Sequence, residues 1–232
     1  MGIIAIIPAR SGSKGVKDKN IKEICGHPLI YYSISAAKKS GIFDCIHVST
    51  NSEKYREIAR CLGADVPILR PESLGTDKTS TWDVVRWVLE YYKSNGYLFD
   101  TVVLLQPTSP LRDSKEIIGA YNFFIDKNAD SVISVCKNGH PTALCNVLDE
   151  TLSMYNFIQM DNARRRQDFK IEYRINGAIY IFKTNLLYTQ FDLYNKNSYA
   201  YIMKESKSID IDTELDFFVA EKLLENDLDK YY

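Results

Sequence analysis

Short apolar runs alternate with longer amphipathic stretches along the first 135 residues, and this alternation restricts the chain to few folds. The first run, Ile3 to Pro8, reads IIAIIP, a continuous apolar segment of strand length that is typical of a central parallel strand covered on both faces. Further strands are expected at 45–50, 66–69, 101–106 and 131–135, and helices at 28–40, 52–62, 81–93 and 113–127. Strands that alternate with helices predict an α/β fold, with a mostly parallel sheet and helices on both of its faces.

The rhythm loosens after residue 136. Residues 137–175 contain His140-Pro141 and the basic run Arg164-Arg165-Arg166, and a hairpin is a possible structure within them. The segment suggests an inserted lobe or an oligomerisation arm. Beyond it, strands are expected at 176–182 and 209–211, and a closing helix at 213–224. We therefore predict one α/β domain over residues 1–232, with an inserted lobe at about 137–175.

The balance of charges argues against a general nucleic-acid or anionic-membrane binder. Such proteins depend on a basic surplus, whereas 29 Lys and Arg face 30 Asp and Glu here. The five cysteines are an odd number with no C-x-x-C pair, so we expect reduced, mostly buried thiols rather than a disulfide framework or a zinc site. Because no apolar run approaches the roughly 18 residues of a membrane helix and the N-terminus lacks the pattern of a signal peptide, a cytoplasmic protein is expected.

A loop rich in glycine, serine and cations follows the first strand directly. Residues 8–20 read PARSGSKGVKDKN, so backbone N–H groups can approach an anion while Arg10, Lys14, Lys17 and Lys19 supply positive charge. The loop matches neither the Walker A pattern nor G-x-G-x-x-G. A solvated basic loop is the plain alternative, but the end of a buried first strand is where open α/β sheets bind ligands. We interpret the segment as a polyphosphate-binding loop.

Two aspartates form a second candidate site. Asp210 and Asp212 stand two residues apart in the segment SIDID, and on a strand such residues share a face. Neighbouring carboxylates repel each other unless a cation or a proton lies between them, and Mg²⁺ takes one or two carboxylates together with phosphate oxygens. The alternatives are solvated aspartates at a strand edge, or an Asp212 that caps the helix predicted from Thr213. Beside a phosphate loop, the pair favours a magnesium site.

Two further segments offer groups to a ligand. Gln106, Thr108 and Ser109 follow a predicted central strand in the sequence LLQPTSPLR, where amide and hydroxyl groups can face a polyhydroxy ligand. The same hydroxyls can instead close a tight turn. The arginines at 164–166 can hold a carboxylate in a bidentate fashion, although three adjacent arginines are more often a partly solvated face.

With these segments in hand, the sequence resembles the bacterial acylneuraminate cytidylyltransferases, the CMP-sialic acid synthetase family. The matching segments, in order, are IPARSGSKGVKDKN (7–20), LLQPTSPLR (104–112), RRQDFKIEYRINGAIYI (165–181) and SIDIDTELD (208–216), with weaker matches at ILRPESL (68–74) and HP (140–141). The sequence departs from the family pattern at Ser11, where many members carry glycine, and at 168–172, which lack a proline often found there.

The resemblance implies a Rossmann-like nucleotidyltransferase sheet with a small dimerisation lobe, and a homodimer. It implies that CMP passes from CTP to the anomeric hydroxyl of a nonulosonic acid, with N-acetylneuraminate as the expected acid, in a reaction that releases pyrophosphate and requires Mg²⁺. The partners are then CTP and the sugar acid, with no nucleic acid and no membrane.

The resemblance also implies roles for single residues. Lys14 and Lys19 would stabilise charge in the transition state, Asp210 and Asp212 would hold the metal, and either the metal pair or Asp212 itself would help to deprotonate the sugar hydroxyl. The residues implied at the nucleotide are Arg10, Ser13, Lys14, Lys19, Asn20, Arg70 and Ser80. Those implied at the sugar are Gln106, Thr108, Ser109, Arg166, Gln167, Tyr173 and Asn176.

Three alternatives stay open at this point. The sugar acid could be legionaminic acid or another keto sugar acid. A metal-dependent glycosyltransferase could use Asp210 and Asp212 on a nucleotide sugar, although its pair would normally follow a middle strand and the N-terminal cationic loop would have no use. A non-catalytic nucleotide-binding module is the third, and the presence of both aspartates and Lys19 argues against it.

Overall fold

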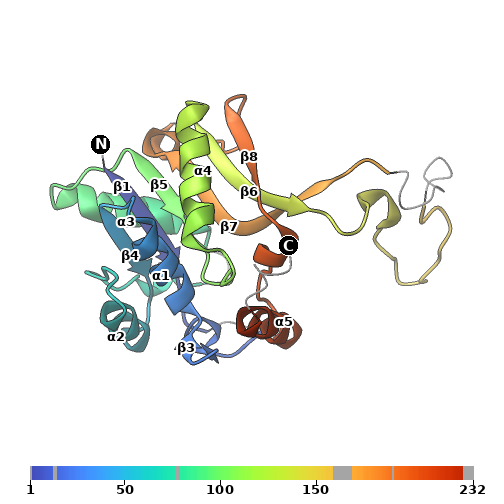
Figure 1. Ribbon diagram of the computed structural model, residues 1–232, viewed down its shortest axis with the longest axis horizontal. Helices are drawn as coiled ribbons and strands as arrows, with labels where there is room; N and C mark the ends of the chain where they lie inside the picture. The colour runs from blue at the N-terminus through green and yellow to red at the C-terminus, as the bar shows by residue number, and fades with distance from the viewer. Residues whose placement is uncertain (1, 13–14, 77–78, 159–168, 190, 227–232) are drawn as a thin grey trace.

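The computed structural model describes residues 2–12, 15–76, 79–158, 169–189 and 191–226 (Figure 1). Its main sheet has the strand order β4-β1-β5-β7-β6-β8. These strands are β1 (Ile3–Pro8), β4 (Cys45–Ser49), β5 (Thr101–Leu104), β6 (Ser131–Lys137), β7 (Tyr173–Lys183) and β8 (Ser198–Ile202). Strand β7 runs antiparallel to both of its neighbours, whereas the other pairs are parallel. The prediction of a mostly parallel α/β sheet is confirmed.

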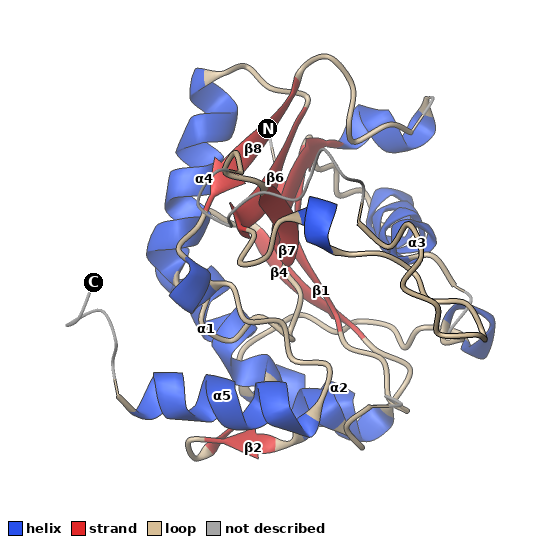
Figure 2. Ribbon diagram, turned by 90° about the vertical axis from the view of Figure 1, so that its right-hand side faces the viewer, coloured by secondary structure: helices blue, strands red, loops and turns tan. Residues whose placement is uncertain are grey.

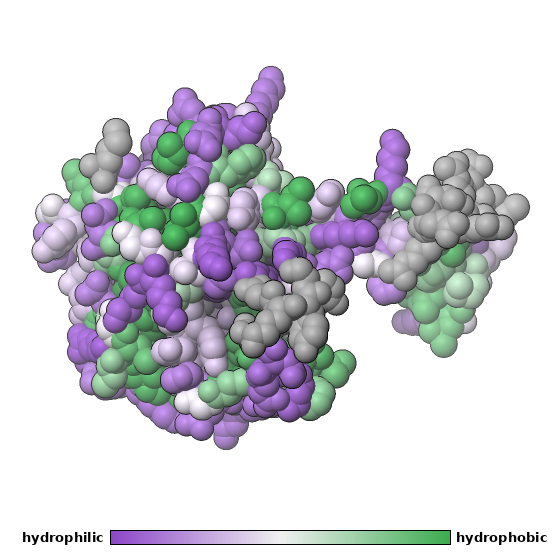
Figure 3. All heavy atoms as spheres, viewed as in Figure 1, coloured by the Kyte–Doolittle hydropathy of each residue, from purple (hydrophilic) through white to green (hydrophobic). Residues whose placement is uncertain are grey.

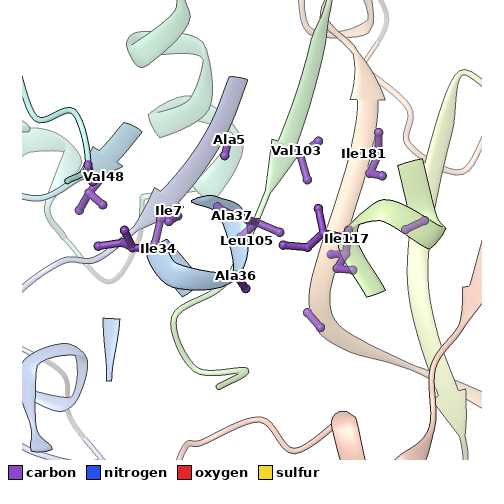
Figure 4. Packing of buried hydrophobic residues seen from close by; sticks show 14 of the residues in the cluster. Ala5, Ile7, Ile34, Ala36, Ala37, Val48, Val103, Leu105, Ile117 and Ile181 are labelled. Carbon is purple, nitrogen blue, oxygen red and sulfur yellow. The ribbon is translucent and has the colours of Figure 1, made fainter. Parts of the chain in front are cut away.

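Helices cover both faces of this sheet (Figure 2). They are α1 (Ile30–Ser40), α2 (Glu53–Cys61), α3 (Thr81–Ser94) and α4 (Ser114–Asp126), and a fifth helix, α5 (Glu214–Glu225), lies apart from them. Along β1, Ala5 and Ile7 pack in the core beneath α1 and α4 (Figure 4), whereas Ile4 and Ile6 pack in the core beneath α3. A strand buried on both faces needs apolar residues at every position, which explains the run IIAIIP.

The remaining helix α5 covers a small two-stranded sheet at one end of the molecule. This sheet pairs β2 (Glu23–Ile24) with β3 (His27–Pro28). Ile24 packs with Phe217 of α5 and with Ile211, which precedes that helix. The contact brings the C-terminal segment beside the chain that follows β1.

Two predicted strands are wrong. Residues 66–69 make no ladder with the sheet; an isolated bridge between His47 and Asp65 precedes them, and Pro67 has no N–H to continue it. Residues 209–211 are irregular, although the N–H of Ile211 donates to the carbonyl of Thr108 at 2.9 Å. The prediction missed β8, whose sequence SYAYI has no fully buried residue and so lacks the continuous apolar run of a central strand. The other predicted elements agree with the structure to within three residues at each end.

Residues 138–158 and 169–172 form the described part of an arm, which leaves the body at the end of β6 and returns into β7 (Figure 1). Lys137 pairs with Tyr173 at its base. The described part of the arm contains a 3-10 turn at Thr142–Leu144 and no hairpin. The predicted lobe is thus an extended arm in its described part, and the arginine run at 164–166 lies outside the described residues.

The five cysteines are unpaired. Cys25, Cys61 and Cys145 are exposed, so the prediction of mostly buried thiols is wrong, whereas Cys45 and Cys136 are buried. Among the described helices, none has the length and apolar character needed to cross a membrane.

Candidate active site

A cavity of about 490 Å³ opens where β1 and β5 end. Strand β1 pairs with β4 on one side and β5 on the other, so the order of the chain across the sheet reverses there. Open α/β sheets bind ligands at such a switch point because the loops diverge and leave a crevice. The wall includes Arg10, Lys19, Arg70, Gln106, Asp210 and Asp212.

The loop after β1 and the aspartate pair meet at this cavity. Lys19 Nζ lies 3.0 Å from Asp212 Oδ1 and also donates to the carbonyl of Ile211. Gly15 approaches the same segment so closely that a Cβ there would collide with the Asp212 carbonyl oxygen. The two segments, almost 200 residues apart in sequence, therefore form one wall.

The two aspartates differ in their surroundings. The Asp212 side chain is 76% exposed, whereas Asp210 is largely buried and its Oδ1 has no hydrogen-bond partner within the described chain. Burial raises the pKa of Asp210, which the Thr108 hydroxyl counters by hydrogen bonding and the charge of Asp212 reinforces. A buried carboxylate oxygen without a donor, beside a second carboxylate, is a donor set that fits an oxygen-seeking cation such as Mg²⁺.

The structure excludes helix capping as the role of Asp212. Thr213 is the N-cap of α5, and it forms a reciprocal capping box with Asp216. The N–H of Asp212 donates to the Asp216 carboxylate at 3.1 Å, so the Asp212 carboxylate is left for Lys19 and the cavity.

Two guanidinium groups face the cavity from the β1 and β4 side. Arg70 is 5% exposed, and Ser49 at the end of β4 accepts from its Nε at 3.1 Å and from its Nη2 at 2.7 Å. Burial and the nearby charge of Arg10 lower the pKa of Arg70 to about 10. Two cations held this close favour a ligand with several negative charges.

The remaining predicted nucleotide residues are placed differently. Asn20 is buried and lines the cavity, but its amide donates to the Arg10 carbonyl at 3.0 Å and so also fastens the loop. Ser80 is the exposed N-cap of α3, where its hydroxyl accepts from the Trp82 N–H. Ser13 and Lys14 lie outside the described residues.

The predicted sugar residues fall into three groups. Gln106 and Thr108 line the cavity. Ser109 and Asn176 are buried and are absent from the described part of its wall. Tyr173 stands half-exposed at the base of the arm. Arg166 and Gln167 lie outside the described residues.

Asn176 and Gly177 nevertheless bear on the site. Asn176 accepts from the Ser134 hydroxyl at 2.6 Å and donates to that of Ser208 at 2.9 Å, so it ties β7 to the segment before Asp210. Gly177 has a φ of +75°, and a Cβ there would lie 2.5 Å from Gln106 Oε1. The Gln106 side chain therefore rests directly on the backbone of β7.

The sequence analysis missed three threonines that line the cavity. Thr76, Thr79 and Thr81 precede or begin α3, and the hydroxyls of Thr76 and Thr79 lie 2.9 Å apart. Their segment, GTDKTST at 75–81, is rich in hydroxyls, but the pattern is also that of an ordinary helix start. No second signal in the sequence separates a ligand-binding segment from an ordinary helix start.

Comparisons with known proteins agree with this geometry. The family model described as "Cytidylyltransferase" matches residues 4–231. The chain is 40% identical over 220 residues to an N-acylneuraminate cytidylyltransferase of Escherichia coli O18:K1:H7, covering 94% of this chain and 51% of that protein. The chain thus spans about half the length of this relative and of the other N-acylneuraminate cytidylyltransferases it matches.

Two other matches cover both chains almost completely. A CMP-N,N'-diacetyllegionaminic acid synthase of Legionella pneumophila is 34% identical over 229 residues, with 97% of each chain covered. Among solved structures, a CMP:2-keto-3-deoxy-manno-octonic acid synthetase complexed with CTP aligns with a TM-score of 0.73 at 16% identity, covering 98% of this chain and all of that one. The structural match shows a shared fold.

Proposed function

The chain belongs to the cytidylyltransferase family, and from this premise we propose that it transfers CMP from CTP to the anomeric hydroxyl of N-acetylneuraminate and releases pyrophosphate. The observation that carries the proposal is the ion pair between Lys19 and Asp212, which joins the cationic loop to the aspartate pair in one cavity. A glycosyltransferase with a metal pair would leave this loop without a use.

A second acid has specific support. The relative named for N,N'-diacetyllegionaminic acid is less similar than the N-acylneuraminate enzymes, but it matches this chain over nearly its whole length. The two acids share the nine-carbon keto acid framework and differ in their substituents. Legionaminic acid is therefore the alternative substrate.

The nucleotide side would hold the triphosphate by charge. Arg10, Lys19 and Arg70 line one cavity, and buried or partly buried cations attract a polyphosphate more strongly than solvated ones. Lys14 and Ser13 join this set by the family resemblance. The threonines at the start of α3 offer hydroxyls to the rest of the nucleotide.

The reaction joins the anomeric oxygen of the sugar to the α-phosphorus of CTP. The bond from that phosphorus to the bridging oxygen breaks, and pyrophosphate leaves with the electron pair. Lys19 is placed to offset the negative charge that gathers on the phosphoryl oxygens. The exposed Asp212 carboxylate accepts the proton of the sugar hydroxyl in this proposal, because it faces the cavity and Lys19 holds it in place.

Asp210 and Asp212 are the residues that would hold Mg²⁺. When bound, the ion supplies positive charge that complements the cations of the loop. Asp210 suits this position since its buried Oδ1 has no other partner in the described chain. Thr108 fixes the orientation of the same carboxylate through its hydroxyl.

The sugar side is proposed to be completed by a second copy of the chain. Large apolar side chains stand exposed on the arm (Figure 3), with Val147 at 90%, Leu152 at 69% and Tyr155 at 86%. Exposed apolar clusters of this kind mark interaction surfaces. A homodimer in which each arm packs on the partner would cover them, and CTP as a substrate suits the proposed cytoplasmic location.

The test is a substrate panel. Purified protein is incubated with CTP, Mg²⁺ and one of four acids: N-acetylneuraminate, N,N'-diacetyllegionaminic acid, pseudaminic acid or 3-deoxy-manno-octulosonate. Pyrophosphate release and the CMP-sugar are then measured. We expect the highest kcat/KM with N-acetylneuraminate. A higher value with the legionaminic acid would establish the alternative, and CTP binding without pyrophosphate release for any acid would overturn the enzyme proposal.

A further inference from the structure

Arg112 is a buried cation that the proposed reaction does not use. Its side chain is 1% exposed, and its Nε and Nη1 have no hydrogen-bond partner within the described chain. It forms no ion pair there either, because the neighbouring carboxylate of Asp113 binds Lys207 at 2.7 Å. Buried charges are normally paired, so the two hydrogen bonds that the Arg112 side chain does make need an explanation.

Both of these hydrogen bonds converge on one carbonyl group. Arg112 Nη2 donates to Ser33 Oγ at 2.6 Å and to the Gln106 carbonyl at 3.3 Å, and Ser33 Oγ itself donates to that carbonyl at 3.1 Å. The carbonyl begins a turn in which the Ser109 N–H also donates to it, at 3.4 Å, whereas Pro107 and Pro110 have no N–H to donate. The side chains of Ser33 and Arg112 therefore reinforce a turn that has few backbone hydrogen bonds of its own.

The turn carries two groups of the candidate site. The side chain of Gln106 rests on Gly177, and Thr108 follows two residues later. Thr108 hydrogen-bonds the carboxylate of Asp210 through its hydroxyl and the Ile211 N–H through its carbonyl. A shift of the Gln106 carbonyl would therefore displace both the Gln106 side chain and, through Thr108, the carboxylate of Asp210.

We propose that Arg112 is a positioning residue, which fixes the turn at Gln106 from beneath and so aligns Gln106 and Thr108 with the aspartate pair. The inference rests on the proposed function only in assigning Gln106 to the sugar acid. A purely structural role makes the opposite prediction for stability: it requires that loss of Arg112 destabilise the fold. Replacing a buried, incompletely paired charge by an apolar side chain of similar size is often neutral or stabilising.

The decisive variant is Arg112→Met, compared with Ser33→Ala. For Arg112→Met we expect kcat/KM for the sugar acid to fall by about 100-fold, the scale of a misplacement of about 1 Å. The dissociation constant for CTP should stay within about twofold, and the melting temperature should be unchanged or higher. Ser33→Ala removes one hydroxyl from the cluster and should cost about fivefold in kcat/KM.

Arg60→Met is the matched control, because Arg60 also donates to a carbonyl, that of Val66 at 2.9 Å, and does not line the cavity. It should leave kcat/KM unchanged. Two results for Arg112→Met would overturn the inference. One is a lower melting temperature together with a loss of CTP affinity as large as the loss of kcat/KM. The other is a wild-type kcat/KM. If Arg112→Met does not fold, wild-type kinetics in Ser33→Ala would overturn the inference instead.

A second readout does not depend on turnover. The side-chain amide of Gln106 gives a pair of resonances in a proton–nitrogen correlation spectrum, which Gln106→Ala identifies by their loss. We expect this pair to shift or broaden in Arg112→Met and in Ser33→Ala. If the wild-type protein turned over no sugar acid, the proposed function would fail, and an unmoved Gln106 pair would separately overturn the positioning role.

Discussion

At the nucleotide side of the cavity, Arg70 is 5% exposed and Ser49 binds its guanidinium twice, whereas on the arm Val147 is 90% exposed and Tyr155 86%. The first region places charged groups where the protein itself desolvates and orients them. The second places apolar groups in water. The same chain thus completes one part of its site internally and leaves another with a surface that folding alone does not bury.

The difference follows from the elements on which each region is built. Arg10 follows β1 closely, and Arg70 is hydrogen-bonded to Ser49 at the end of β4, so strands buried in the core hold both cations. The arm has no strand between Lys137 and Tyr173 in its described part. Groups on rigid elements can be held to a catalytic geometry, while an arm suits contact with another body.

Asp212→Asn should give the largest effect, because Asp212 is the proposed acceptor of the sugar hydroxyl proton. The variant tests whether the catalytic residues lie in the cavity and not on the arm. We expect kcat to fall about 1,000-fold, within the range for loss of a general base, with fold and CTP binding retained. Steady-state kinetics and calorimetry with CTP measure the two. Glu150→Gln removes a carboxylate from the arm and should leave kcat unchanged. Near wild-type turnover in Asp212→Asn would remove its catalytic role.

Gly15→Ala should come next, since it wedges apart the two segments that make the wall. Its Cβ would collide with the Asp212 carbonyl oxygen, and we expect kcat/KM to fall about 100-fold as the geometry shifts. Gly139→Ala is the control on the arm, where a Cβ meets nothing within 4 Å. An equal fall of kcat/KM in both variants would mean that activity depends no more on the geometry of this wall than on that of the arm.

Much of the compact region could be predicted from sequence. The run IIAIIP predicted β1, and the loop after it was placed correctly because the ends of parallel strands define where a crevice lies. Asp210 and Asp212 do line one cavity, although the strand used to argue it is absent. The hydrophobic periodicity of the sequence was enough to predict that the loop after β1 and the aspartate pair lie at the same site. It was not enough to predict the irregular backbone between Ser208 and Asp212.

Other features depend on contacts that sequence spacing does not encode. Ser49 and Arg70 are 21 residues apart, and Ser33 and Arg112 are 79 apart, so neither pair is visible before the fold is known. The strand at 66–69 was predicted from its apolar residues, but Pro67 has no backbone N–H to donate to a neighbouring strand. The sites of Ser13, Lys14, Arg166 and Gln167 remain predictions.

Ser49→Ala sharpens the comparison at the level of one hydroxyl. Because the Ser49 carbonyl still accepts from Arg70, only one of the two hydrogen bonds is lost, and we expect the dissociation constant for CTP to rise about fivefold. Calorimetry measures it. Ser131→Ala is the matched control: its hydroxyl is also buried and donates to a carbonyl, that of Leu193 at 2.6 Å. An equal rise in both would trace the effect to general stability.

The smallest effect on the nucleotide side should come from the arm itself. The double variant Val147→Asp, Tyr155→Asp places charges where the proposed dimer buries apolar side chains, so sedimentation should show a loss of dimer at concentrations where the wild type is associated. The dissociation constant for CTP should change by less than about twofold, because no described arm residue lines the cavity. If CTP affinity falls along with association, the partner contributes to the nucleotide wall as well. The nucleotide side and the arm would then belong to one site shared between two subunits, and a single chain would not form a complete nucleotide site.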